Sequence, residues 1–295
     1  MTYSPDVVGT PETAGAIDAT TLVHRTRSFR SVSAILAIAF LAVIGLVSLL
    51  APLLPLDPTT TDLAIRWQPP SAAHWFGTDE LGRDYFSRVV YGGRISLTVG
   101  ILAMAAATAI GVLVGLIAGY AGGRVDDLLM RFVDFLSSIP WMVLVIVASV
   151  FLKPGLWTII FIIAVFSWMA TARLVRAETL TLRERPFVRY ARYIGVRRGL
   201  VVWRHVVPDA TPTIIVAATA SISTAILTES ALSFLGLGIQ PPMASWGSLL
   251  ETAQGSLQTA PYLALIPGVL ILVTVLSFNV LGDALRQSVS EGGGR

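Results

Sequence analysis

Six long stretches of this sequence carry no charged residue, and they constrain the fold more than any other feature. A helix of about 20 apolar residues, rising about 1.5 Å per residue, crosses the ~30 Å hydrocarbon layer of a bilayer. The uncharged stretches are 31–56, 95–123, 135–152, 154–172, 210–228 and 252–282. We therefore predict an all-α membrane protein with six transmembrane helices.

The composition supports a membrane protein and excludes an ordinary soluble domain. Only 13% of the residues are charged and 54% are hydrophobic, whereas a soluble domain is about 25% charged. A seventh uncharged stretch, 230–250, contains several glycines and serines and the pair Pro241-Pro242. These residues favour an irregular or re-entrant segment over a spanning helix.

The distribution of the basic residues predicts the orientation. Cytoplasmic loops of membrane proteins are enriched in Lys and Arg. If the N-terminus is cytoplasmic, 16 of the 21 Lys and Arg residues lie inside, nine of them between 173 and 204. Those left outside are Arg66, Arg83, Arg88, Arg94 and Lys153. We therefore expect both termini to be cytoplasmic.

Several kinds of chemistry are excluded by the residues themselves. The only lysine, Lys153, is not part of a phosphate-binding P-loop, so this chain has no such nucleotide site. Cysteine is absent, and the three histidines are too far apart in sequence to predict a metal site. Glu229 is the main ionisable residue within the predicted spans. It is either a buried hydrogen-bonding group at a helix end or a ligand on the translocation path.

The charge pattern divides the chain into segments. Residues 57–94 and 173–208 are the two non-membrane segments long enough to have roles of their own. The predicted organisation is a disordered cytoplasmic tail at 1–30, a first anchor helix at 31–56, an extracytoplasmic segment at 57–94, a five-helix core at 95–288 that includes the cytoplasmic loop 173–208, and a tail at 289–295.

In the extracytoplasmic segment we predict an interfacial helix that begins at Thr78. Threonine is a good N-cap, and acidic residues in the first turn suit the helix dipole. The supporting residues are Asp79 and Glu80 in that turn, the repeat of Leu81, Tyr85 and Val89, and an i, i+4 pair of Asp84 with Arg88. A plain surface helix leading into the second span explains the same pattern.

In the cytoplasmic segment we predict two short helices. Pro186 fits the start of the first and Gly195 its end, and the second runs from about Val196 to Val207, before Pro208. A capping Thr211, before Pro212, then begins the next span. The apolar face of the first helix is Phe187, Tyr190, Ala191 and Ile194, and its basic face is Arg185, Arg189 and Arg192. Such a pair either rests on anionic lipid or docks into a partner protein; it carries no nucleic-acid recognition pattern.

Three segments together resemble the permease subunits of bacterial ATP-binding-cassette (ABC) importers for peptides, specifically the C-type subunit of the DppC/OppC-like family. One runs from Phe76 to Arg94 and reads FGTDELGRDYFSRVVYGGR. Another is LSFLGLGIQPP at 232–242, followed by Ser245-Trp246-Gly247. The third is the cytoplasmic helix pair, which is similar to the coupling loop of that family.

The resemblance implies a type I importer (MetI-like) permease fold in a bacterial plasma membrane. It implies a second homologous permease as partner, two cytoplasmic ATPase subunits or one fused ATPase, and an extracytoplasmic solute-binding protein. ATP and Mg²⁺ would be bound by the ATPases, with no cofactor and no enzymatic activity in this chain. The implied sites are the ATPase-coupling residues Phe187, Arg189, Tyr190, Ala191, Arg192 and Gly195; the translocation path or outer gate residues Glu229, Phe234 and Gln240; and the interfacial motif residues Gly77, Thr78, Asp79, Gly82, Arg83 and Asp84.

The chain departs from the family pattern at Arg189, where the coupling motif usually has a glutamate. We therefore expect the ATPase partner to present an acidic or neutral groove there. Dipeptides or oligopeptides are the expected solutes. Nickel complexes, haem and glutathione are alternatives within the family, and a stand-alone channel or secondary carrier is an alternative outside it.

Overall fold

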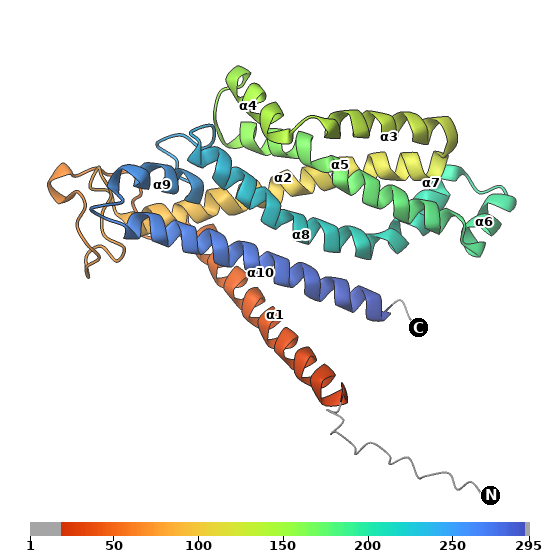
Figure 1. Ribbon diagram of the computed structural model, residues 1–295, viewed down its shortest axis with the longest axis horizontal. Helices are drawn as coiled ribbons and strands as arrows, with labels where there is room; N and C mark the ends of the chain where they lie inside the picture. Colours follow the sequence, from red (N-terminus) through yellow and green to blue (C-terminus); the bar gives the residue numbers. More distant parts are fainter. Residues whose placement is uncertain (1–18, 293–295) are drawn as a thin grey trace, which may run out of the picture.

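Long helices running side by side dominate the architecture (Figure 1). In this computed structural model, the backbone is described for residues 19–292 and the side chains for 32–289, apart from 142, 149 and 150. The α-helices of this part are α1 (Ala19–Leu50), α2 (Tyr85–Ala121), α3 (Gly123–Ser138), α4 (Trp141–Phe151), α5 (Leu156–Arg183), α6 (Pro186–Tyr193), α7 (Arg198–Val201), α8 (Val207–Phe234), α9 (Trp246–Ala253) and α10 (Tyr262–Gly292).

Five helical segments of the described chain are long and apolar enough to cross a bilayer. They are Val32–Leu53, Tyr85–Ala121, Leu156–Arg183, Arg198–Phe234 and Tyr262–Val289. Each overlaps one of the predicted spans. Most extend past the predicted ends because a charged residue does not stop a helix where it emerges from the lipid or pairs with another residue.

The remaining predicted span, 135–152, is not one continuous helix. It is divided at Ile139-Pro140 between the end of α3 and the eleven-residue helix α4. Proline disfavours helical geometry in the residue before it, and Ile139 is accordingly extended. At ~1.5 Å per residue, α4 alone is about 16 Å long and does not cross the hydrocarbon layer. The hydrophobic run therefore corresponds to a broken helical segment.

The predicted tails are partly helical. Helix α1 begins at Ala19, inside the predicted tail 1–30, and residues 1–18 lie outside the described part of the chain. Helix α10 runs to Gly292, into the predicted tail 289–295, and residues 293–295 lie outside the described part.

The helix that leads into α8 differs from the prediction. Instead of ending at Pro208, the helical path runs from α7 through a π-helical turn at Val202–Val206 directly into α8. Pro208 is the second residue of α8, directly after this π-helical turn. Thr211 does not cap a helix; it lies within α8 and donates from its hydroxyl to the carbonyl of Val207 at 2.7 Å.

Helix α2 lies at the centre of the bundle and contacts α1, α3, α5, α8 and α9. Its closest partner is α5. An ideal Cβ atom on Gly115 would lie 2.6 Å from the carbonyl oxygen of Ala172, so the two backbones approach more closely than any side chain permits. Helix α1 packs mainly against α10 and α2 and leans away from the other helices (Figure 1). The first span is therefore peripheral to the bundle.

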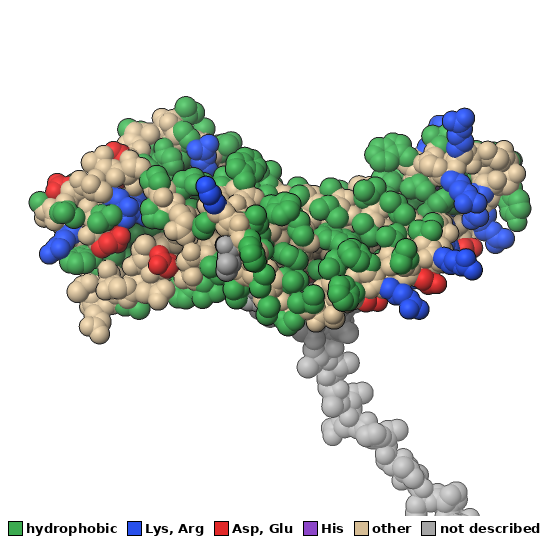
Figure 2. Space-filling model, turned by 90° about the horizontal axis from the view of Figure 1, so that it is seen from above, with side chains coloured by type: hydrophobic (Ala, Val, Ile, Leu, Met, Phe, Trp, Pro, Cys, Tyr) green, Lys and Arg blue, Asp and Glu red, His purple; other side chains and the backbone are tan. Residues whose placement is uncertain are grey.

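The two ends of the bundle differ in character. One end, here called the basic end, carries α6 and α7, and Lys and Arg side chains gather most densely there (Figure 2). The other end, here called the cap, consists of the loops at 57–84 and 235–245 together with α9 (Figure 1). The predicted irregular segment at 230–250 therefore contains a loop at 235–245 between the end of α8 and the start of α9. The last span begins at Tyr262 instead of 252, because α9 and a 3₁₀ turn at Gln254–Ser256 precede it.

Candidate functional site

At the basic end, α6 forms as predicted. Pro186 is its first residue, and the chain leaves it through Gly195, whose φ is +80°. The N–H of Gly195 donates to the carbonyl of Arg192, and that of Val196 to the carbonyl of Ala191, both at 3.1 Å. These bonds satisfy carbonyls that a helix end leaves free, and the left-handed turn they require suits glycine.

Only part of the predicted apolar face of α6 packs against the rest of the chain. Val188 and Ala191 are buried against Val201, the last residue of α7. Tyr190 and Ile194, which were predicted to share an apolar face with Ala191, are 66% and 61% exposed. The structure therefore places only small and branched side chains against the bundle, and it presents the larger apolar ones outward.

Three further predicted coupling residues are also exposed. Phe187 is 42% exposed, and its ring centroid lies 6.0 Å from that of His205. Arg189 and Arg192 are exposed as well. Aromatic and basic side chains therefore share one outward surface, a mixture typical of protein interfaces, and the coupling role of these residues stays a prediction.

At the cap, the interfacial motif residues form a tight turn before α2 instead of a helix. The helix begins at Tyr85, and Asp84 is its N-cap, accepting a bond from the N–H of Ser87 at 2.8 Å. Asp84 also contacts Nδ1 of His74 at 3.0 Å, so it does not form the predicted pair with Arg88. The predicted start at Thr78 is wrong, because Gly82, between Thr78 and the start of α2, has a φ of +71°, far from the α-helical value.

This turn packs against residues 62–68, a preceding segment of the cap. Thr78 is fully buried, and its hydroxyl accepts from the N–H of Gln68 at 2.9 Å and donates to the carbonyl of Ile65. A Cβ atom on Gly82 would lie 1.7 Å from the carbonyl oxygen of Asp62, so only glycine fits there. The motif is therefore a packing device for the 62–68 segment.

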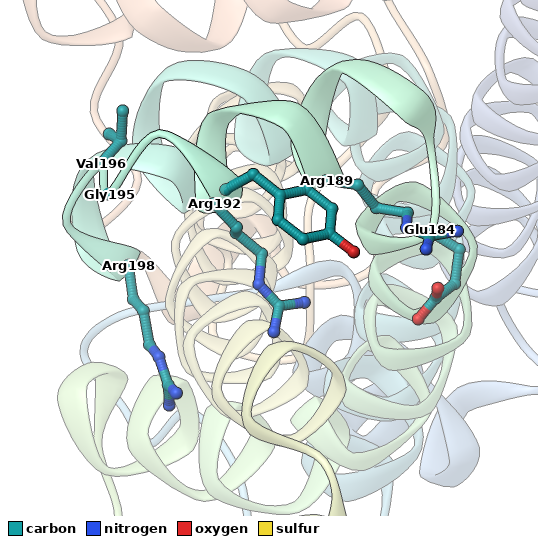
Figure 3. A pocket seen from close by; sticks show the side chains of 7 residues that line it. Glu184, Arg189, Arg192, Gly195, Val196 and Arg198 are labelled. Carbon is teal, nitrogen blue, oxygen red and sulfur yellow. The ribbon is translucent and has the colours of Figure 1, made fainter.

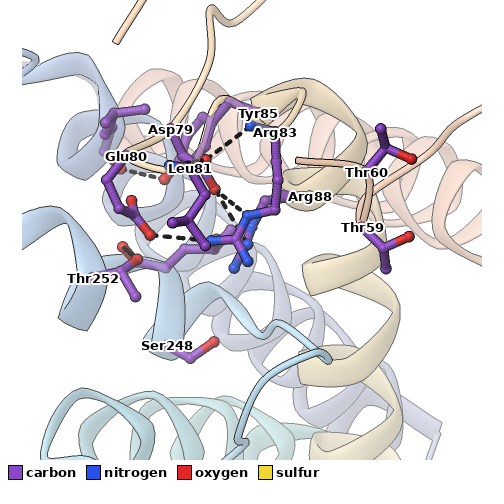
Figure 4. A network of polar contacts seen from close by, with 12 residues as sticks. Thr59, Thr60, Asp79, Glu80, Leu81, Arg83, Tyr85, Arg88, Ser248 and Thr252 are labelled. Carbon is purple, nitrogen blue, oxygen red and sulfur yellow. Dashed lines mark hydrogen bonds and ion pairs between the residues drawn. The ribbon is translucent and has the colours of Figure 1, made fainter. Parts of the chain in front are cut away.

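Buried charges cross-link the turn (Figure 4). Asp79 accepts from Nε of Arg83 at 2.7 Å and forms an ion pair with Arg88 at 3.2 Å. The same carboxylate accepts from the N–H groups of Leu81 and Arg83 at 2.9 and 3.0 Å. Glu80 binds the other end of the Arg83 guanidinium at 3.0 Å. Asp79 is thus the hub that fixes the turn to the first turns of α2.

The cap also forms hydrogen bonds with the start of α10 and the turn before it. No pattern in the sequence predicted these contacts. The hydroxyl of Tyr262 donates to the carbonyl of Gln68 at 2.8 Å, and Nε1 of Trp67 donates to the hydroxyl of Ser256 at 3.1 Å. The hydroxyl of Tyr85 donates to the carbonyl of Leu263. These contacts join residues about 180 positions apart, and no spacing in the sequence indicates them.

Glu229 lies fully buried in α8, near the cap. Its carboxylate accepts from the hydroxyls of Ser96 at 2.9 Å and Ser233 at 2.7 Å. Ser96 in turn accepts from the N–H of Trp246, and Ser233 from the N–H of Ile239, both at 3.2 Å. This network ties α2, α8 and α9 to the connecting loop, which favours the hydrogen-bonding interpretation of Glu229.

The two other residues predicted for the path lie close by in sequence but outside this network. Phe234 ends α8 and is exposed. Gln240 is partly exposed, and its amide donates to the carbonyl of Gly236 at 2.9 Å. Their assignment to a translocation path or outer gate stays a prediction.

A further polar contact, between α3 and α5, was also missed. Arg176 binds both carboxylate oxygens of Asp126, at 2.5 and 2.7 Å. Arg173 reaches Asp134 at 3.0 Å. An arginine on one helix and an acidic residue on another, 39 to 50 positions away, carry no local signal. Among the described residues, no group of three or more His, Cys, Asp or Glu side chains is placed to hold a metal ion.

Residues 111–291 match the protein family described as the binding-protein-dependent transport system inner membrane component. That match includes α5, the basic end and the cap segment after α8. It covers more than half of the chain.

Three curated relatives are similar over most of their length. The dipeptide transport system permease protein DppC of Alkalihalophilus pseudofirmus is 42% identical, covering 78% of this chain and 75% of the relative. The oligopeptide transport system permease protein OppC of Bacillus subtilis is 40% identical, covering 79% of this chain and 76% of the relative. The glutathione transport system permease protein GsiD of Pectobacterium atrosepticum is 41% identical, covering 75% and 73%.

A solved structure of the inward-facing MetNI methionine ABC transporter has a chain of the same fold. It superposes with a TM-score of 0.56 at 20% identity, covering 69% of this chain and 97% of that one. The chain thus has the MetI-like permease fold and belongs to the family of binding-protein-dependent transport system inner membrane components, as a multi-pass ABC permease subunit of the DppC/OppC-like type.

Proposed function

We propose that this chain is the permease subunit of an ATP-driven importer for dipeptides or oligopeptides and forms half of its translocation pathway. The observation that carries this proposal is the basic end, where α6 presents aromatic and arginine side chains outward while being fixed to the spanning helices. The peptide substrate is supported by relatives named for dipeptide and oligopeptide transport at 40–42% identity. Glutathione is the second candidate, because a relative at 41% identity is named for it.

The basic end faces the cytoplasm in this proposal, together with both termini. Sixteen of the 21 basic residues then lie on the cytoplasmic side, as the positive-inside rule requires. The cap faces outward, where a solute-binding protein would deliver the peptide. A second, homologous permease completes the pathway as a heterodimer.

The energy for transport comes from ATP hydrolysis by other chains. Two ATPase subunits, or one fused ATPase, bind ATP and Mg²⁺, and this chain binds no cofactor and catalyses no reaction. The ATPases change position as they bind ATP, and the docked helix α6 moves with them. The spanning helices then rock between inward- and outward-facing states.

The connections of α6 suit the transmission of such a movement. Only Glu184 and Arg185 separate it from α5, and the N–H of Arg185 donates to the carbonyl of Leu182 at 3.1 Å. On its other side, α7 continues without a break into α8. Tyr120 of α2 packs against the small core beneath α6 that contains Val188. A displacement of α6 therefore acts on α2, α5 and α8 together.

The experiment is a deletion strain with the chain restored on a plasmid. Uptake of a labelled dipeptide should be lost on deletion and restored by the wild-type chain, and the tagged chain should co-purify with an ATPase. The Gly195→Asp variant should insert in the membrane but restore less uptake. Purified alone, the chain should hydrolyse no ATP. Unchanged uptake after deletion would contradict the peptide substrate, and purification without any ATPase would contradict the importer.

A further inference from the structure

A basic pocket lies beside α6 (Figure 3). It has a volume of about 590 Å³ and opens around the turn that follows the helix. Its lining residues are Glu184, Arg189, Arg192, Tyr193, Gly195, Val196 and Arg198. Residues on both sides of the left-handed turn at Gly195 contribute, so the turn brings Arg198 to the same pocket as the arginines of α6.

Within the described part of the chain, the arginines of this pocket have no acidic partner. No described residue forms an ion pair with Arg189, Arg192 or Arg198. The one carboxylate of the lining, Glu184, is paired with Arg183 at 3.2 Å. Three like charges around one opening repel each other, and a ligand of opposite charge relieves that repulsion.

We propose that this arginine pocket receives acidic side chains of the ATPase subunit that docks on α6. The inference rests on the proposed function and adds the chemistry of the contact. A guanidinium binds a carboxylate through two parallel hydrogen bonds. The neighbouring Tyr190, Tyr193 and Ile194 are largely exposed, and tyrosine beside arginine is the composition of interface hot spots.

The position of the pocket favours a protein over a lipid headgroup. The uncharged part of α5 ends before Arg173, and α6 follows after Arg183. From Arg173 to Arg183 the helix rises by about 15 Å, at ~1.5 Å per residue. The headgroup layer on one side of a bilayer is only about 5–8 Å deep. Helix α6 also lies beyond the end of α5 (Figure 1). The pocket is therefore located in the cytoplasm, beyond the lipid phosphates.

The test uses the scarcity of lysine in this chain. Its only lysine is Lys153, in the turn between α4 and α5, at the opposite end of α5. In the complete transporter, Arg192→Lys or Arg198→Lys places a new amine in the pocket. A carbodiimide then joins that amine directly to any carboxylate in contact with it. We expect a cross-linked peptide that connects residue 192 or 198 to an Asp or Glu of the ATPase.

The matched control is Arg204→Lys. Arg204 is exposed on the same segment but does not line the pocket, so it should give no cross-link to the ATPase. Charge reversal is the second measurement: Arg189→Glu together with Arg192→Glu should lower the amount of ATPase retained by roughly tenfold, since like charges across an interface repel. Arg204→Glu should leave retention unchanged.

The outcomes separate the two proposals. If the wild-type chain retains the ATPase but neither pocket lysine cross-links to it, or charge reversal leaves retention unchanged, the arginine pocket is not its acidic contact. If the effect of charge reversal appears in nanodiscs that contain anionic lipid and is absent in neutral ones, the pocket holds a lipid phosphate and the inference is wrong. If the wild-type chain retains no ATPase, the proposed function itself fails.

Discussion

Ser96 on α2 and Glu229 on α8 are joined by a buried hydrogen bond of 2.9 Å, although they are 133 residues apart in sequence. The carboxylate also binds Ser233, and the two serines hold backbone N–H groups of the loop and helix that follow α8. A single acidic side chain thus positions the cap segment after α8 relative to α2.

Replacing Glu229 should therefore destabilise the protein. Glu229→Ala removes the acceptor of two buried hydroxyls, and an unsatisfied buried polar group costs about 1–3 kcal/mol. We expect a lower free energy of unfolding, measured by thermal denaturation in detergent. Glu229→Gln retains an acceptor oxygen and should lower the free energy of unfolding by less. Thr219→Ala, at a partly exposed position of the same helix, is the control. Equal stability of Glu229→Ala and the control would show that the network contributes nothing.

Asp79 should matter more than its neighbour Glu80. Asp79→Asn leaves two largely buried arginines, Arg83 and Arg88, without their shared negative charge, and breaking a buried ion pair costs about 3–5 kcal/mol. Glu80 contacts Arg83 alone and is partly exposed, so Glu80→Gln should cost at most about 1 kcal/mol. Thermal unfolding of both variants measures the difference. The hub role of Asp79 is wrong if the two variants are equally stable.

Gly195 and Gly199 form a matched pair for the turn at the basic end. Neither glycine has any atom within 4 Å of an added Cβ, but only Gly195 has a positive φ. Gly195→Ala should cost about 1–2 kcal/mol of backbone strain and displace the turn, so peptide uptake should fall. Gly199 lies in α7, where Ala is favoured over Gly, so Gly199→Ala should retain wild-type uptake. Similar uptake by both variants would refute the need for a left-handed turn.

Gly115 tests the contact between α2 and α5. A Cβ atom there meets backbone of α5 at 2.6 Å, and overpacking a close contact costs about 1–3 kcal/mol. Gly115→Ala should lower the unfolding temperature. Gly45→Ala on the peripheral α1 meets nothing within 4 Å and should be neutral or stabilising, because Ala is the better helix former by about 0.5–1 kcal/mol. A stable Gly115→Ala variant would mean that α2 and α5 can move apart without cost.

Local chemistry explains which features were predictable. The hydrophobic stretches located the long helices because a span needs a minimum number of apolar residues. Pro186 and Gly195 marked the limits of α6 because their backbone preferences act within a single turn. The same local approach failed at Thr78, where good capping residues lie in a turn between two glycines with positive φ. The next aspartate, Asp84, caps the helix instead.

The sequence by itself determined the membrane class, most of the spans, the separation of the two polar ends and the resemblance to peptide permeases. These follow from composition and from motifs that lie within short segments. Only the tertiary structure decided which side chains of α6 face outward, that Asp79 holds Arg83 and Arg88 together, and that Ser96 meets Glu229. Those contacts join residues on different helices or turns, and their distances depend on how the helices pack. The arginine pocket arises in the same way, since the left-handed turn at Gly195 brings Arg198 beside Arg189 and Arg192.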